Sequence, residues 1–360
     1  MRLPTLRFRD LTVNLIELTR ALIDIPSLSG DEAEVGRFLF SYLEGLGYNV
    51  ERQDVVDGRS NIIAMLDEEA RVVLSTHMDT VPPYIASSED EEYVYGRGAC
   101  DAKGIIAAMI CAAERLRAEG VAGIGLLFTV DEELGSLGAR AANRHPRARA
   151  CRFMINGEPT DNRLAVGSKG SLRLVIKTSG RAAHSAYPEH GESAIEKLLD
   201  VLADIRATGW PSDEFFGETT CNIGTITGGT RANVIPAEAQ AALQIRLVTE
   251  ADVIKEAIER AVAGRARVEY QSVASPVRML AVEGFEPCIV RFTTDIPHLS
   301  NWGVPLLVGP GSILLAHTSE ERIAKRELAE AVELYVGLVR ALLARSGESE
   351  GETFAEEARR

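Results

Sequence analysis

The sequence contains Arg71-Val72-Val73-Leu74-Ser75-Thr76-His77-Met78-Asp79, in which an apolar run leads directly into a histidine and an aspartate. Residues 71–76 are predicted to form a strand, and His77 then lies at its carboxyl end. Side chains at the carboxyl ends of several strands in an open α/β sheet converge on one crevice. Imidazole nitrogen and carboxylate oxygen are the ligands that a hydrolytic zinc site uses. This stretch therefore predicts one part of a metal site at the edge of an α/β sheet.

Three more apolar runs, each predicted to be a strand, end in residues of the same kind. They are residues 124–130 before Asp131-Glu132-Glu133, residues 153–156 before Glu158, and residues 312–316 before His317. A fifth motif, Gly96-Arg97-Gly98-Ala99-Cys100-Asp101-Ala102-Lys103-Gly104, contributes Asp101. Five ligands are too many for one catalytic zinc that must keep a position for water. They suit two metals that share a bridging carboxylate.

The composition excludes several classes of protein. A length of 360 residues suits two domains, or one large α/β domain with an insertion. With 46% apolar and 26% charged residues, the chain reads as a soluble globular protein. A net charge of −14 argues against a nucleic-acid partner. The sequence also lacks a basic cluster that would favour binding to an anionic membrane. The longest apolar stretch, residues 105–113, is too short to span a membrane and is predicted to be a buried helix.

Cysteine usage indicates the compartment. Five cysteines are spread widely along the chain without a Cys-x-x-Cys pair, namely Cys100, Cys111, Cys151, Cys221 and Cys288. An odd, scattered set fits a reducing environment, so we expect a cytoplasmic protein. Residues 1–15 alternate arginine with apolar residues and lack a continuous apolar core, so we do not expect them to be a signal peptide.

The spacing of apolar residues predicts two domains. The first part has helical patterns over residues 11–25, 32–46 and 103–119, the last closed by Gly120, and paired strands over residues 48–53 and 61–66. Alternation of strands and helices predicts a mainly parallel sheet with helices on both faces.

After Gly167 the order becomes β-α-β-β-α-β, the order of a ferredoxin-like α+β unit. We therefore predict a second domain at residues 168–280, inserted in a discontinuous domain of residues 1–167 and 281–345. A final helix is expected over residues 320–344, followed by a disordered tail at residues 346–360.

Each candidate residue also has a plainer interpretation. The acidic triplet would be a solvated loop if it stood alone, and Asp101 would be a helix N-cap. Arg246 lies in an alternating strand and would be a solvated face residue, although an arginine fork suits a carboxylate well. Arg231 is a second candidate for that task. A lone His184 would be an ordinary surface or core histidine.

The motifs together resemble one family. His77-x-Asp79-x-Val-Pro, Gly96-Arg-Gly-x-x-Asp-x-Lys-Gly104, the Glu132-Glu133 pair, Gly157-Glu158-Pro and Ala316-His317 occur in the order found in the dinuclear zinc aminoacylase and carboxypeptidase G superfamily. This superfamily includes acetylornithine deacetylases, succinyl-diaminopimelate desuccinylases and several di- and tripeptidases. The resemblance covers nearly the whole chain, and it implies a zinc-peptidase-like sheet domain with an inserted lid that also carries the dimer contact.

The resemblance implies a role for each matching residue. His77 and Glu158 would complete one metal site, Glu133 and His317 the other, and Asp101 would bridge both. Asp79 would accept a hydrogen bond from the far nitrogen of His77 and fix its tautomer. Glu132 would be the general base.

The lid residues follow from the same resemblance. His184, in Ala183-His184-Ser185, matches a lid histidine that reaches into the site, often from the partner subunit. Asn233 and Arg246 match positions that hold a substrate carboxylate. Cys100 and the Thr-Ser-Glu-Glu that follows His317 are mild departures from the family pattern.

The sequence thus predicts a dinuclear zinc amidohydrolase, with cobalt or manganese as alternative metals. We expect it to cleave the amide of a small N-acylated amino acid, as acetylornithine deacetylase does, and to form a homodimer through the lid. A dipeptidase or carboxypeptidase uses the same machinery on a short peptide and remains the alternative. A catalytically dead, metal-dependent binding protein is less favoured because a binder needs no general base. A zinc aminopeptidase without a lid is disfavoured by the inserted domain.

Overall fold

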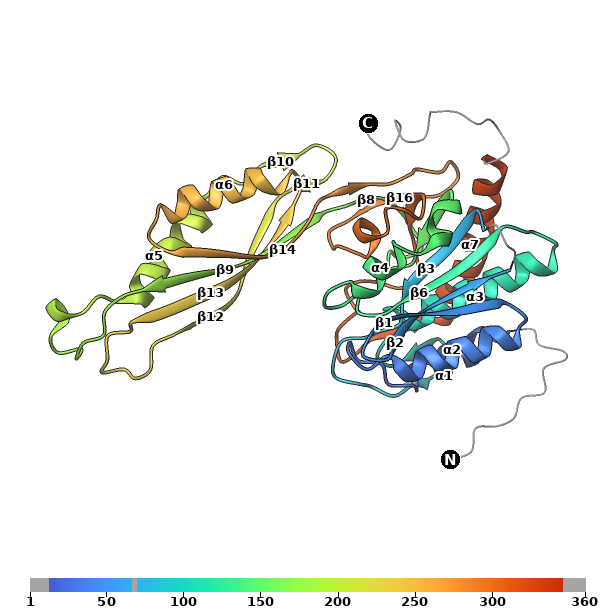
Figure 1. Cartoon of the computed structure of the whole chain (residues 1–360), viewed down its shortest axis with the longest axis horizontal. Coiled ribbons are helices and arrows are strands. Elements are labelled where there is room, and N and C mark those ends of the chain that lie inside the picture. Colours follow the sequence, from blue (N-terminus) through green and yellow to red (C-terminus); the bar gives the residue numbers. More distant parts are fainter. Residues whose placement is uncertain (1–12, 67–69, 346–360) are drawn as a thin grey trace. The chain divides into compact units, whose positions relative to one another are not determined.

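A computed structural model describes residues 13–66 and 70–345 of the chain. The chain divides into two compact units (Figure 1). Among the described residues, the first comprises 13–66, 70–166, Met279–Cys288 and 294–345. The second comprises Gly167–Arg278 and Ile289–Thr293.

The first unit is an α/β structure. Its helices are α1 (Leu15–Ile23), α2 (Ala33–Gly45), α3 (Lys103–Ala118), α4 (Leu137–Ala142) and α7 (Lys325–Arg345), with 3-10 turns η1 (Pro146–Ala150) and η3 (Ile296–His298). The main sheet contains β1 (Asn49–Val56), β2 (Arg59–Met65), β3 (Val72–His77), β6 (Ile124–Thr129), β7 (Phe153–Asn156), β8 (Leu164–Ser168), β15 (Val277–Arg278), β16 (Pro287–Val290) and β17 (Val304–Leu307). Of these strands, β15 and the last residues of β8 and β16 belong to the second unit. A small sheet contains β4 (Ser88–Glu89), β5 (Tyr93–Tyr95) and β18 (Arg322–Ala324).

The centre of the main sheet is parallel, as the sequence predicted. The strand order is β1-β2-β6-β3-β7-β17-β8-β15, and β16 also pairs with β8. Strands β6, β3, β7 and β17 run parallel to one another, whereas β1 and β2 form an antiparallel hairpin whose strand β2 pairs with β6, also antiparallel. Parallel strands that end at the same edge bring the residues after His77, Thr129 and Asn156 to one place.

Burial explains why these strands read as continuous apolar runs. All residues of β3, β6 and β7 are buried, as expected for parallel strands covered on both faces. Helix α3 lies in the same core and packs against α1, α7, β3 and β6. Gly120 follows α3 with a φ of 77°, a conformation that glycine adopts at no steric cost, so the predicted stop is confirmed.

The second unit has the predicted ferredoxin-like order. Its elements are β9 (Gly170–Ser179), η2 (Pro188–His190), α5 (Ala194–Ala207), β10 (Ser212–Asp213), β11 (Gly217–Glu218), β12 (Thr220–Gly228), β13 (Glu238–Leu247), α6 (Ala251–Val262) and β14 (Arg267–Ala274). Four strands form an antiparallel sheet in the order β12-β13-β9-β14. Alternate residues of β9 and β13 pack against α5 and α6, and the opposite sheet face is largely polar.

Two local predictions were wrong, and so was the plainer interpretation of Asp101. Residues 312–316 do not form a strand: after β17 the chain turns through Gly311, which has a φ of 84°, and His317 itself has a φ of 65°. Asp101 is not the cap of α3, because the capping position is Ala102 and no side chain caps it. The last helix begins at Lys325, because residues 322–324 pair with β5 instead.

Some predictions lie outside the described residues, namely the tail at 346–360 and the start of the first helical pattern at residues 11 and 12. Within residues 13–66 and 70–345, no helix combines the length and apolar character needed to cross a membrane.

Candidate metal centre and active site

Two groups of side chains that could hold a metal ion lie at the carboxyl edge of the parallel strands. His77, Asp101 and Glu158 form the first group, and Asp101, Glu133 and His317 form the second. In each group, one donor atom from each residue lies within 4.8 Å of the donor atoms of the others. All five residues singled out in the sequence as ligands are therefore together, and Asp101 belongs to both groups.

Asp101 has one oxygen directed at each histidine. Its Oδ1 lies 2.9 Å from His77 Nε2, and its Oδ2 lies 3.2 Å from His317 Nε2. The same His317 nitrogen lies 2.8 Å from Glu133 Oε1. A carboxylate that shares its two oxygens between two ligand sets has the geometry of a bridge between two cations.

The cluster concentrates negative charge in a buried place. Burial, together with the neighbouring charge of Glu158, raises the pKa of Glu132 well above its usual range. Burial likewise raises the pKa of Glu158. Hydrogen bonds to Asp101 and Glu133 raise the pKa of His317 to about 10. The raised pKa values mean that a proton or a cation bound at this cluster is stabilised by the carboxylates.

One buried oxygen lacks a partner. Glu158 is 5% exposed, and its Oε1 has no hydrogen-bond donor among the described residues. A buried carboxylate oxygen without a donor is costly, and a bound cation removes that cost. The two imidazoles and three carboxylates therefore fit a pair of divalent cations.

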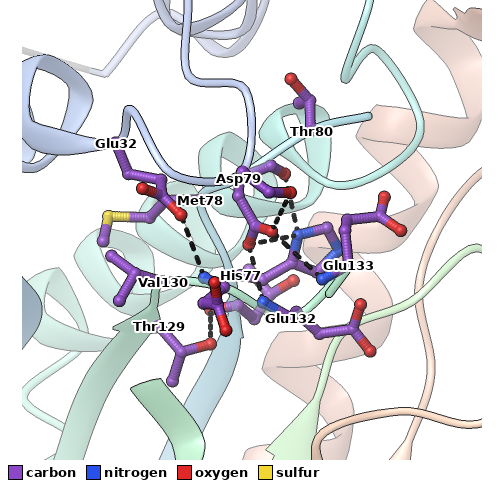
Figure 2. A network of polar contacts seen from close by, with 12 residues as sticks. Glu32, His77, Met78, Asp79, Thr80, Thr129, Val130, Glu132 and Glu133 are labelled. Carbon is purple, nitrogen blue, oxygen red and sulfur yellow. Dashed lines mark hydrogen bonds and ion pairs between the residues drawn. The ribbon is translucent and has the colours of Figure 1, made fainter. Parts of the chain in front are cut away.

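Asp79 lies behind His77 and holds the acidic triplet (Figure 2). His77 Nδ1 lies 2.9 Å from the main-chain oxygen of Asp79 and 3.5 Å from its Oδ1. The Asp79 carboxylate also accepts hydrogen bonds from the backbone N–H of Glu132 at 3.0 Å and of Glu133 at 3.1 Å, and from the Ser29 hydroxyl at 2.7 Å. One carboxylate thus ties the end of β3 to the end of β6.

Glu132 and Glu133 have different surroundings. The Glu133 carboxylate contacts His317, whereas no described residue donates a hydrogen bond to the Glu132 carboxylate. Glu132 is half-buried and lies at the end of β6, next to the ligand cluster. Its carboxylate is free to take part in proton transfer.

The sequence did not reveal the role of Glu321. Its carboxylate forms a buried ion pair with Arg97 and accepts hydrogen bonds from the backbone N–H of Gly98, Cys100 and Asp101, at 3.0, 3.3 and 3.2 Å. This carboxylate fixes the loop that presents Asp101. Arg97 within the glycine-rich motif was the only local signal, because a buried arginine there needs a distant carboxylate.

Asp295 is a second residue that the sequence did not reveal. It is 1% exposed and accepts a hydrogen bond from the Thr129 hydroxyl at 2.9 Å, while its Oδ1 has no partner among the described residues. Burial raises its pKa to about 6. The available signal was a single acidic residue in the otherwise uncharged stretch at residues 292–297.

The predicted substrate and lid residues lie in the second unit, at two ends of its sheet. His184 pairs with Val234, and the backbone of Asn233 accepts a hydrogen bond from Ser185, so His184, Arg231 and Asn233 share one end. Arg246 pairs with Ser171 at the other end of β13. Most of β13 separates the two ends, about 25 Å at 3.3 Å per residue.

Comparison with known proteins identifies the family. Residues 73–341 match the pattern of Peptidase family M20/M25/M40. The chain belongs to this family. A Peptidase M20 domain-containing protein of Schizosaccharomyces pombe is 37% identical over 341 residues, covering 91% of this chain and 84% of the relative. A probable carboxypeptidase of Emericella nidulans is 37% identical over 381 residues, covering 92% and 90%.

Solved structures of the M20 family share the fold. A metallo-carboxypeptidase from Sulfolobus solfataricus has a TM-score of 0.74 at 16% identity, covering 92% of this chain and 99% of that one. The YXEP protein of Bacillus subtilis, described as a dinuclear metal-binding peptidase, has a TM-score of 0.63 at 17% identity, covering 91% and 98%. The family predicted from the motifs is thus confirmed, and the chain is a hydrolase of the metallopeptidase kind.

The Asp295 carboxyl predicts a pH-dependent gain in stability on substitution. Its pKa of about 6 exceeds that of an unfolded aspartate, about 3.9, so the ionised form disfavours folding. This penalty is absent below about pH 4, grows between about pH 4 and pH 6, and is fully present at pH 7. Asp295→Asn should therefore increase the free energy of unfolding of chelator-treated protein at pH 7 by at most about 3 kcal/mol, and its unfolding temperature should rise accordingly. The gain should shrink towards pH 4.5. An equal change at both pH values would contradict the assignment.

Proposed function

We propose that this M20 protein hydrolyses the amide bond of N-acylated amino acids, releasing a carboxylate and a free amine. The observation that carries the proposal is the cluster in which Asp101 faces both histidines while the Glu132 carboxylate stays unpaired beside it. Acetylornithine deacetylase-like activity is the first choice of substrate class.

The same five residues are proposed to hold two divalent ions. His77 and Glu158 would hold one ion, Glu133 and His317 would hold the other, and Asp101 would contribute to both. The donor distances and the unpartnered oxygen of Glu158 support this arrangement, as does the dinuclear description of the YXEP protein. Zinc is the proposed metal, and cobalt or manganese suit the same nitrogen and oxygen donors. When bound, the ions lower the pKa of a water molecule and polarise the scissile carbonyl.

Glu132 is proposed to move the proton. As a carboxylate next to the cluster, it takes a proton from the attacking water while the hydroxyl adds to the carbonyl carbon. It then passes that proton to the amine nitrogen as the carbon–nitrogen bond breaks. Asp79 keeps Glu132 in place through the backbone and positions His77.

Arg246 is proposed to bind the carboxylate of the substrate. It is half-buried, and among the described residues it has no carboxylate partner. Burial and the positive charge of the nearby Arg173 lower the pKa of Arg246. A bound anion would therefore stabilise the charged guanidinium. A guanidinium fork matches a carboxylate.

A second copy of the chain is proposed to complete the site. Asn233, Arg231 and His184 lie far from Arg246 within one unit, so one substrate cannot reach both ends of the same sheet. A homodimer joined through the second unit would supply His184 and Asn233 from the partner. In this proposal residues 168–280 form the lid and residues 1–167 with 281–345 form the catalytic domain.

The five cysteines are all unpaired, which supports a cytoplasmic location.

Carboxypeptidase or dipeptidase activity is the second candidate, because relatives at 36–37% identity are named probable carboxypeptidases. Both reactions break an amide bond whose amine side is an amino acid with a free carboxylate. A binding protein without activity is less favoured, since it needs no unpaired carboxylate at Glu132.

A substrate panel tests the proposal. N-acetyl and N-succinyl amino acids and dipeptides are assayed with added zinc or cobalt, beside analogues whose α-carboxylate is an amide. We expect acyl amino acids to be cleaved best, and the amides to lose about 1.5–3 kcal/mol of transition-state binding, the worth of one charge-assisted contact. Faster cleavage of dipeptides would favour the second candidate. No cleavage with either metal would refute both.

Glu132 and Glu133 should separate catalysis from metal binding. Glu132→Ala should keep nearly all bound metal and lose about 10² to 10⁴-fold in kcat, because only the proton-transfer group is removed. Glu133→Ala should lose one metal. Metal analysis and kinetics on both variants check this, and the opposite pattern would mean that the two roles are exchanged.

The dimer proposal predicts complementation. His184→Ala should lower kcat while both metals stay bound, because an imidazole that stabilises the oxyanion is worth about 2.7–4 kcal/mol. If His184 acts across the dimer, mixing His184→Ala with Glu132→Ala yields mixed dimers that have one site with both groups intact. Part of the activity should then return after subunit exchange. Proven exchange without recovery would place His184 in its own chain's site or outside catalysis.

A further inference from the structure

A buried ion pair lies beside the acidic triplet, and the proposed mechanism gives it no task. Arg59 Nη1 lies 3.2 Å from both carboxylate oxygens of Glu32 and 3.3 Å from Asp131 Oδ1. Glu32 is 1% exposed, Arg59 8% and Asp131 5%. Glu32 immediately precedes α2, and Arg59 begins β2, so both come from parts of the chain remote from the acidic triplet.

Asp131 is held at every polar group. Its N–H donates to Glu32 Oε1 at 3.1 Å, and its carboxylate receives Arg59 and the N–H of Leu137 at 3.4 Å. Its carbonyl oxygen accepts from the N–H of Gly135 and of Ser136, at 3.1 and 2.6 Å. Asp131 needs this support because its φ is 68°, in the left-handed region that side chains disfavour.

This conformation decides where the next two residues point. Directly after Asp131, the N–H groups of Glu132 and Glu133 both donate to Asp79, one to each oxygen. The triplet is thus fixed by Glu32 and Arg59 at its first residue and by Asp79 at the other two. Figure 2 shows the Glu32 carboxylate directed towards the chain that joins Val130 to Glu132. No described residue bonds the Glu132 carboxylate, so the backbone alone sets its place.

We propose that Glu32 and Arg59 are positioning residues for the general base Glu132. They hold Asp131 in its left-handed conformation, and that conformation directs Glu132 towards the reacting water. Glu32 and Arg59 themselves contact neither metal nor substrate in this proposal. The inference rests on the proposed role of Glu132.

Three variants test it. Arg59→Met removes the charge between two buried carboxylates, Arg59→Lys keeps a charge without the fork, and Glu32→Gln keeps the shape of the acceptor. For Arg59→Met we expect kcat to fall about 10–100-fold with KM and bound zinc unchanged, since misplacement by about 1 Å can cost 10²-fold. Arg59→Lys should recover part of this loss, and Glu32→Gln should show a smaller loss of the same kind.

Leu39→Ala is the matched control. Leu39 is buried on α2, the helix that follows Glu32, and it packs in the apolar core. All variants are assayed at a temperature where circular dichroism shows them folded. The control should unfold at a lower temperature yet keep the parent's kcat. If Arg59→Met does not fold, Glu32→Gln and Arg59→Lys carry the test.

The outcomes are distinct. A Leu39→Ala protein that loses as much kcat as the Arg59 and Glu32 variants would reduce the effect to general destabilisation and overturn the inference. Loss of zinc in the variants would assign the pair to the ligand cluster and also overturn it. Full kcat in the folded variants, with Glu132→Ala inactive, would defeat this inference alone. An active Glu132→Ala enzyme would defeat the proposed function itself.

Discussion

The first unit depends on one constraint: several negative charges are packed together where water is largely excluded. Five carboxylates crowd the carboxyl edge of the parallel strands, namely Asp79, Asp101, Glu132, Glu133 and Glu158. Unpaired charges are costly to bury, so such a cluster needs donors or cations. The imidazoles of His77 and His317 supply hydrogen bonds to some of these carboxylates, but Glu158 Oε1 has no partner among the described residues. The pair of cations in the proposed function is the remaining answer.

The loops that carry the cluster share one device, a buried carboxylate that accepts backbone N–H groups. Asp79 holds the two residues after Asp131, Glu321 holds the loop before α3, and Glu32 holds Asp131 itself. A charged acceptor makes each hydrogen bond stronger than a neutral one would. The parallel strands bring the loops together, and these carboxylates fix the direction in which each ligand points.

The sequence predicted that the candidate ligands lie together because His77, Glu133 and Glu158 come at or just after strand ends, and the parallel sheet puts those ends at one edge. The prediction of a strand at residues 312–316 was wrong, because it rested on apolar composition alone. The chain turns at Gly311 and reaches His317 through further turns. Glu321 and Asp295 were missed because their partners lie 224 and 166 residues away, where no local pattern points to them. The roles of His184, Asn233 and Arg246 remain predictions, since they depend on a second copy of the chain.

A crystal structure of the zinc-loaded protein, with anomalous diffraction collected on both sides of the zinc edge, tests the central claim most directly. The account predicts two zinc peaks in each chain, one beside His77 and Glu158 and the other beside Glu133 and His317, with Asp101 between them. A single peak in a fully active protein, or zinc bound away from these five residues, would contradict it.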